Sequence, residues 1–128
     1  MLKYLGLVFL MVLFLVPQSF AATVSVAEGV ITTQIIDRAP VDTIDSYSAQ
    51  QDKLYCFTKI VGAEGETEVT HVWWYKEKEM ARVTLPVRSA SWRTNSSKNI
   101  LPEWSGAWKV QVLDESGQEV GVIPFTLL

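Results

Sequence analysis

The sequence contains a single cysteine, Cys56, and a single histidine, His71. A disulfide bond within the chain is therefore excluded, and a zinc site would have only these two residues from which to draw its usual ligands. A nucleophile elbow is also missing, and Asn95 stands three residues before Lys98, where a serine–lysine pair of the β-lactamase type needs serine. These absences remove most arrangements for metal or nucleophilic catalysis, and the sequence indicates no cofactor.

Net positive charge and long apolar runs are also missing. The formal net charge is −3, which excludes a nucleic-acid-binding protein that works through bulk positive charge. The longest apolar run, Tyr4 to Val16, has thirteen residues, fewer than the ~20 that a membrane-spanning helix needs. The overall composition, 48% apolar and 20% charged, is that of a folded domain and not of a disordered tail.

The short apolar run has the flanks of an export signal. A lysine precedes it, a proline and polar residues end it, and the small residues Ser19 and Ala21 occupy the positions that a signal peptidase reads. We predict a helical signal peptide over residues 1–21, with Ala22 as a second cleavage position, and one mature domain over residues 22–128. The mature protein is then periplasmic or secreted and has no transmembrane segment.

The mature segment has the pattern of an all-β domain. No stretch carries the apolar spacing of an amphipathic helix, and short strand-like runs separated by turn residues occur instead. Seven such runs in about 100 residues predict a seven-stranded antiparallel β-sandwich of the immunoglobulin-like type. The predicted strands are Gly29 to Asp37, Lys53 to Val61, Thr67 to Lys76, Met80 to Val87, Ser91 to Asn95, Ala107 to Leu113 and Glu119 to Leu127.

Glycines and prolines indicate the turns and the sheet edges. Gly65 and Gly117 can take the left-handed backbone conformation that closes a tight hairpin, so each predicts a hairpin between its flanking strands. Pro86 and Pro124 cannot donate to a strand ladder, and each is expected on an edge strand or at a bulge. The polar segment from Asp37 to Asp52 is expected to be a long loop.

The predicted hairpin around Gly65 bears on a catalytic Cys56–His71 dyad, in which the imidazole would activate the thiol. Counting outward from the loop places Phe57 opposite His71, so Cys56 and His71 point to opposite faces of the sheet. A shift of one residue in register would place both side chains on the same face. The preferred interpretation is a buried free thiol at Cys56 and a hydrogen-bonded histidine in the core.

Both faces of this hairpin are apolar, which leaves two interpretations open. Either both faces are covered, or one aromatic face is exposed as a platform for a ligand. Among the five tryptophans, Trp73 and Trp108 are expected in the core, whereas Trp74, Trp92 and Trp104 can be buried or exposed.

Several motifs together resemble a bacterial family of unknown function. They are Asp37 to Val41, Cys56 to Thr58, His71 to Trp73, Trp92 to Thr94 with Ser97 and Lys98, and Gly106 to Val110. In order and spacing they are similar to the domain-of-unknown-function family 2914, and the similarity extends from about Val30 to Leu127. The resemblance implies a small β-rich extracytoplasmic domain, found alone behind a signal or attached to membrane proteins, and it implies no activity. Trp74 is not part of the resemblance.

Calcium is the metal that the sequence leaves open. Asp42 and Asp45, with Asp37 or Asp52, could supply hard oxygen ligands from one loop. A full calcium-loop signature is missing, so a solvated acidic loop is the preferred interpretation.

A segment without acidic residues is the clearest candidate for a binding surface. It extends from Ala81 to Pro102 and holds four cations, and aromatic side chains in and near it add flat apolar area. The predicted ligand-binding residues are Arg93, Trp92, Arg88, Lys98, Arg82 and Trp74. In a strand without a bulge, Trp92 and Arg93 point to opposite faces, so one of them is expected to be structural. The alternative is that these cations pair with glutamates of neighbouring strands.

The function that the sequence predicts is a non-catalytic periplasmic binding or interaction module, for an anion such as an acidic envelope glycan or a lipid head group. The second prediction is a structural accessory domain of an envelope assembly, which adds an edge strand near Pro86 or Pro124 to the sheet of a protein partner. An enzyme that uses Cys56 and His71 comes third.

Overall fold

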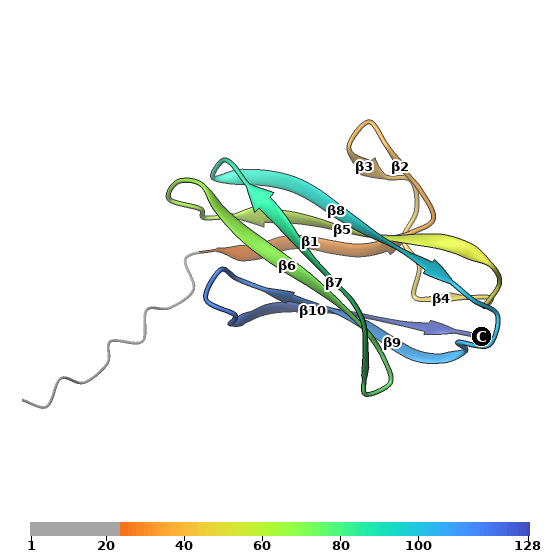
Figure 1. The fold of residues 1–128 in the computed structure, drawn as a ribbon. Helices are drawn as coiled ribbons and strands as arrows, with labels where there is room; N and C mark the ends of the chain where they lie inside the picture. Colours follow the sequence, from red (N-terminus) through yellow and green to blue (C-terminus); the bar gives the residue numbers. More distant parts are fainter. Residues whose placement is uncertain (1–23) are drawn as a thin grey trace, which may run out of the picture.

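The computed structural model describes residues 24–128, which form ten strands and no helix (Figure 1). The strands are β1 (Ser25–Thr32), β2 (Ile35–Ile36), β3 (Ala39–Pro40), β4 (Ser46–Tyr47), β5 (Asp52–Val61), β6 (Thr67–Tyr75), β7 (Lys78–Val87), β8 (Ser91–Ile100), β9 (Gly106–Leu113) and β10 (Glu119–Leu127). The all-β prediction is therefore confirmed. The predicted signal peptide and its cleavage site lie outside the described residues. In residues 24–128 no helix is long and apolar enough to cross a membrane.

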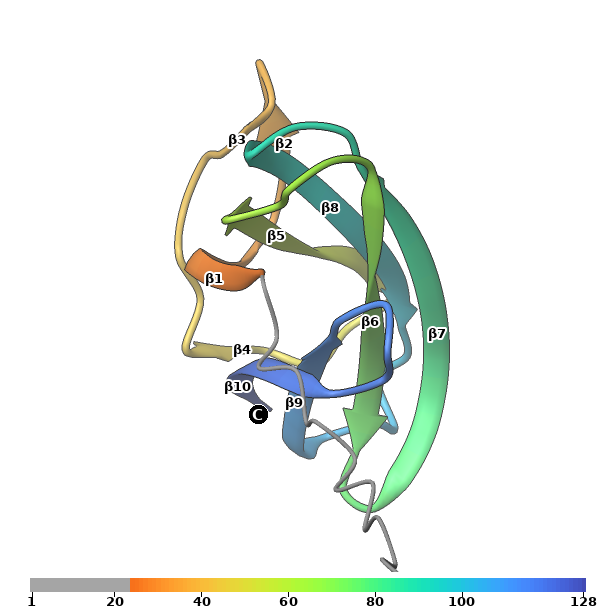
Figure 2. The same cartoon turned by 90° about the vertical axis from the view of Figure 1, so that its left-hand side faces the viewer.

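The strands form two larger sheets and one short hairpin. One sheet has the order β1-β5-β8 and the other has the order β4-β10-β9-β6-β7, while β2 pairs only with β3. The pairings are antiparallel except that of β4 with β10, which is parallel and two residues long. Figure 2 shows the β2–β3 hairpin projecting beyond the two larger sheets, on the side of β8.

The predicted hairpin between the strands on either side of Gly65 is wrong. Strand β5 pairs with β1 and β8, whereas β6 pairs with β7 and β9, so the chain crosses here from one sheet to the other. Ala63 is buried in this crossing, and the Gly62 N–H donates to the Ala90 carbonyl oxygen at 2.9 Å. A crossing and a hairpin can share the same glycine-containing loop sequence. The interpretation in which both strands are covered on both faces is confirmed, since Phe57 and Val72 are buried.

Two strands also differ from the prediction by more than two residues at an end, and both differences have a local cause. The first strand starts at Ser25 and ends at Thr32, whose hydroxyl donates to the Asp42 carboxylate at 2.6 Å where the chain turns away. Strand β8 continues from Asn95 to Ile100 because its polar residues remain paired with β5. The predicted long loop contains the two short strands β3 and β4.

The last predicted hairpin and the placement of the two prolines are confirmed. Strands β9 and β10 pair on either side of the turn at Gly117, which has a φ of 86°. Pro86 lies on β7, the edge of its sheet. Pro124 lies where β10 has only β9 as a paired neighbour, because β4 reaches only Thr126 and Leu127.

The interior between the two larger sheets holds two apolar clusters. The larger cluster contains Ile31, Leu54, Cys56, Trp73, Ile100, Trp108, Val110, Phe125 and Leu127. The smaller cluster contains Val24, Ile60, Ala63, Val69, Val87 and Val112. Both clusters combine side chains from the two sheets, so their burial holds the sheets together. The predicted core positions of Trp73 and Trp108 are confirmed.

A row of buried polar groups lies between the two clusters. The imidazole of His71, on β6, joins the Thr58 hydroxyl at 3.0 Å through Nε2 and the Ser96 hydroxyl at 2.7 Å through Nδ1. The Trp73 indole N–H also donates to the Ser96 oxygen, at 3.0 Å. His71 is fully buried, and burial lowers its pKa to about 4 because the charged form loses its hydration. The neutral histidine thus connects one sheet to β5 and β8 of the other.

The buried imidazole predicts a loss of stability in mild acid. The unfolded chain protonates His71 near pH 6.5, whereas the folded chain resists protonation until about pH 4. The contribution of His71 to the free energy of unfolding is therefore complete above pH 6.5, and about 3 kcal/mol of it is lost as the pH falls to 4. Urea unfolding across this pH range measures the loss.

The control variant is His71→Gln, whose amide can still reach both hydroxyls and which should lack this part of the pH dependence. Because His71 is the only histidine, its ring protons also report directly by NMR. An imidazole that titrates near pH 6.5 in the folded protein would contradict the prediction.

Candidate functional site

The Cys56–His71 pair is not arranged as a nucleophile and its base. Because the two residues come from different sheets, both face the interior, and the prediction that they point to opposite faces of one sheet is wrong. The two ring nitrogens of His71 are nevertheless engaged by Thr58 and Ser96. Burial raises the pKa of the Cys56 thiol far above its usual value, so the thiol stays protonated. The predicted buried free thiol is confirmed.

The acidic loop uses its carboxylates within the fold. Asp42 accepts hydrogen bonds from the hydroxyls of Thr32 and Thr33, and the bond from Thr32 is the main cause of its lowered pKa. Asp52 accepts the Tyr47 hydroxyl at 2.7 Å. Across the part of the chain that the structure describes, no three His, Cys, Asp or Glu residues are grouped as metal ligands.

The rings of Trp74 and Trp104 are accompanied by lysines. The Lys109 ammonium lies 5.8 Å from the ring centroid of Trp74, whose indole N–H donates to Gln111 at 3.1 Å. The Lys98 ammonium lies 4.9 Å from the ring centroid of Trp104. These cation–π contacts occupy ring surface that a ligand would otherwise stack on.

An open groove lies where β5, β8, the β2–β3 hairpin and the loop between β7 and β8 meet. It has a volume of about 450 Å³. Its lining residues are Asp37, Arg38, Lys59, Ser89, Ser91, Trp92 and Arg93. Three of these side chains are cationic and one is anionic, so the groove has an excess of positive charge in a protein of net charge −3.

The groove contains two cations directly opposite each other. Lys59 on β5 and Arg93 on β8 are register partners, and they extend from the same face of the sheet. Like charges in this arrangement repel. On the other side of Lys59 the register partner is Glu28, but within residues 24–128 neither cation forms a salt bridge with a carboxylate. The charges of Lys59 and Arg93 are thus left to solvent or to a ligand.

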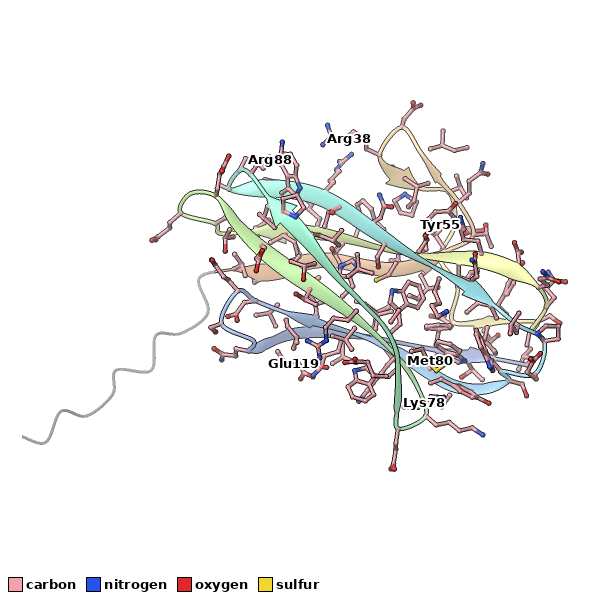
Figure 3. The ribbon with its side chains drawn as sticks, in the orientation of Figure 1. Arg38, Tyr55, Lys78, Met80, Arg88 and Glu119 are labelled. Carbon is pink, nitrogen blue, oxygen red and sulfur yellow. The ribbon has the colours of Figure 1, made fainter. Side chains whose placement is uncertain are left out.

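The third cation, Arg38, is supplied by a strained turn. Asp37 and Arg38 form the tip of the β2–β3 hairpin with φ values of 52° and 63°, in the left-handed region that costs a non-glycine residue ~1 kcal/mol or more. The Arg38 guanidinium carbon lies 5.7 Å from the ring centroid of Trp92. In Figure 3, Arg38 and Arg88 project on the same side of the molecule, the side of β8 and the hairpin.

The structure brings only some of the predicted ligand-binding residues together. Trp92 and Arg93 both line the groove, and the exposed Arg88 directly precedes Ser89 of its lining. The alternation of the strand is confirmed: Trp92 packs against the smaller core cluster, whereas Arg93 is exposed. Trp92 is therefore largely structural and contributes one edge of its ring to the groove.

The remaining predicted residues lie elsewhere. Arg82 forms a salt bridge at 2.7 Å with Glu79, a residue of the same strand β7 and not of a neighbouring strand. Lys98 shares the inward face of its sheet with its register partner Leu54, and Trp74 contacts Gln111 of β9. None of these three lines the groove, so the structure does not bring them together with Arg93 there.

Sequence reasoning missed Arg38 and Lys59. Both lie outside the acid-free segment that drew attention to Arg93, and they reach it only through strand pairing and the projecting hairpin. One signal was present, since Lys59 is the one charged residue between Leu54 and Val61, the mostly apolar part of the central strand β5.

The fold and the groove define an all-β domain with a cationic surface site. The model of a family described as a protein of unknown function (DUF2914) matches residues 66–127, which extend from the start of β6 to the end of β10. The predicted resemblance to this family is confirmed over these residues. The motifs at His71, Trp92 and Gly106 fall within the match, whereas those at Asp37 and Cys56 precede it. No curated protein matches the sequence.

The position of Cys56 predicts that its side chain contributes to stability and not to ligand binding. Cys56→Ser should lower the free energy of unfolding by about 1–3 kcal/mol, because it places a hydroxyl in the apolar cluster. Ligand binding at the groove should not change. Urea unfolding measures the first effect, and Cys56→Ala serves as the control that adds no polar group. Rapid modification of the native thiol by a disulfide reagent would show that its burial is misassigned.

Proposed function

We propose that this domain is a non-catalytic periplasmic binding module that holds an anionic group in the groove between Arg38, Lys59 and Arg93. The observation that supports this proposal is the Lys59–Arg93 pair, two cations opposite each other that form no salt bridge in residues 24–128. An anion between them would convert a repulsive contact into two charge-assisted hydrogen bonds. The guanidinium of Arg93 offers the bidentate geometry that suits a carboxylate or a phosphate.

The ligand class follows from the compartment and from the groove. Export by the predicted signal peptide over residues 1–21 places the domain beside the cell envelope, where anionic groups are carried by acidic glycans and by lipid head groups. The two share a carboxylate or phosphate next to hydroxyls, which the groove serines Ser89 and Ser91 suit. Binding of this kind needs no cofactor and no nucleophile.

The fold we propose is an immunoglobulin-like seven-stranded β-sandwich with β2, β3 and β4 as short additions. The seven strands of eight or more residues support it, because they form a set ordered β1-β5-β8 and a facing set ordered β10-β9-β6-β7. This division agrees with the seven-stranded immunoglobulin domain in six strands, and the fourth, β7, differs because it pairs with β6 in the second sheet. Loops and sheet faces of such domains commonly carry binding sites, which agrees with a module that binds and does not catalyse.

A second candidate function is a structural accessory domain that pairs β7 with the sheet of an envelope protein. The observation in its favour is that β7 is ten residues long and has a paired neighbour on one side only. Pro86 limits such pairing to the part of the strand before it. This function would leave the groove cations without a role.

Removal of Arg93 tests the proposed site. Arg93→Ala should weaken binding of an acidic ligand about tenfold or more, and the lost part should be the salt-sensitive part. Thermal stability should stay unchanged or rise slightly, since the repulsion from Lys59 is removed. Binding is measured by calorimetry with oligogalacturonate and by co-sedimentation with phosphatidylglycerol vesicles, which separates a glycan from a lipid source.

The matched control is Arg82→Ala, an exposed arginine whose partner is Glu79 and which should not affect binding. Arg38→Gly is a second probe, because glycine accepts the left-handed turn and so removes the cation without adding strain. An Arg93→Ala variant that unfolds at a clearly lower temperature would make Arg93 an internal partner and overturn the proposal.

A further inference from the structure

The outward face of β8 is a row of polar side chains. Along this ten-residue strand every second residue is exposed, beginning at the groove. The row consists of Ser91, Arg93, Asn95, Ser97 and Asn99. No apolar side chain interrupts it, so the outer face of β8 is polar over its whole length, as the solvated face of an antiparallel strand commonly is.

The polar groups of this row are free. In residues 24–128 none of the five side chains makes a hydrogen bond to another protein group, although the serines Ser89, Ser96 and Ser116 do so. Serine and asparagine each offer a donor and an acceptor on a short side chain. Such groups lose little conformational entropy when they bind, so a row of them on a fixed strand is well prepared to meet the hydroxyls of a ligand.

The row connects two hollows. The cationic groove lies at its start, at Ser91 and Arg93, and a second hollow of about 430 Å³ lies at its end. The second hollow is lined by Gln51, Asp52, Lys53, Asn99, Ile100 and Leu101. Arg93 and Asn99 are six residues apart on one strand, which corresponds to about 20 Å.

The neighbouring strand gives the row a lateral limit. Phe57 on β5 is the register partner of Asn95 and extends from the same face, yet it is only 2% exposed, whereas Asn95 is exposed. At this position the outer face of β5 is therefore covered, whereas the outer face of β8 is open to solvent. A ligand that passes Phe57 is confined there to a strip along β8, which fits a chain better than a flat surface, and β5 is exposed again at Lys53.

We propose that an extended acidic polysaccharide lies along β8, with an acidic group in the cationic groove and its hydroxyls on Asn95, Ser97 and Asn99. This inference rests on the proposed function, and it names the ligand as a chain of several sugars in place of a single anion. Charge complementarity favours it at the groove, where Arg38, Lys59 and Arg93 outnumber Asp37, whereas at the other end of the strip Lys53 lies beside Asp52 and the two charges balance. A lipid head group would fill the first hollow only.

The test is the dependence of affinity on ligand length. Galacturonate oligomers of defined length are titrated by calorimetry into the mature protein, from the disaccharide to the octasaccharide. The octasaccharide should bind about tenfold or more tightly than the disaccharide. The double variant Asn95→Ala/Asn99→Ala should remove that difference and leave the disaccharide affinity unchanged, because the groove remains intact.

The controls separate the possible failures. Thr126→Ala, which removes an exposed hydroxyl on the other sheet, should change neither affinity. Polyglutamate of equal length carries the charges without the sugar hydroxyls and should bind no better than the disaccharide. Circular dichroism and thermal unfolding confirm that each variant folds.

Three results would overturn the inference. The first is equal affinity for the disaccharide and the octasaccharide. The second is a higher affinity for the octasaccharide that persists in the double variant, and the third is polyglutamate binding as tight as that of the octasaccharide. Each would leave an anion site in the groove and no binding of a sugar chain along β8. If no acidic ligand binds, or if Arg93→Ala has no effect, the proposed function itself fails. The two failures are therefore distinguishable.

Discussion

The hydrogen-bonded bridge at His71 determines how the two larger sheets face each other. Apolar clusters on either side of it supply most of the burial, but apolar contact alone does not fix a relative position as hydrogen bonds do. The bridge reaches Thr58 on β5 and Ser96 on β8. The next residues outward on these strands are Lys59, Asn95 and Ser97, so the same strands that are held from inside carry the polar strip outside. A site built on strands held in this way needs little rearrangement to bind.

Two unfavourable local features meet at the groove. One is the pair of opposed cations, Lys59 and Arg93, and the other is the left-handed turn that carries Arg38. Each costs stability, and the described structure contains no compensating salt bridge for them. Outside the groove the described residues have one further left-handed non-glycine residue, Lys76, with a φ of 54° in the turn between β6 and β7. The prolines lie at edges, glycine closes the last hairpin, and buried polar side chains of residues 24–128 have partners. Exceptions to local rules that gather at one place are expected at functional sites.

The sequence predicted which segments form strands better than it predicted which strands pair with each other. The all-β class and most strand boundaries follow from alternation and turn residues, which are local signals. The sheet assignment of β5 and β6 does not, because both are central strands with two apolar faces and the loop around Gly65 suits either connection. The groove shows the same limit. Arg93 was accessible from the acid-free segment, whereas Arg38 and Lys59 join it only through long-range pairing that charge patterns along the chain do not encode.

The inward orientation of Lys98 has a consequence for contacts between copies of the domain. Strand β8 is a sheet edge, and such an edge can recruit strands from other chains and seed aggregates. A chain that added to β8 would have to cover the ammonium of Lys98, which shares the inward face with Leu54, and so would strip a charge of its water. The lysine thus opposes pairing of β8 with a strand of another chain. Many copies of the domain could bind along one polysaccharide without pairing edge to edge through β8.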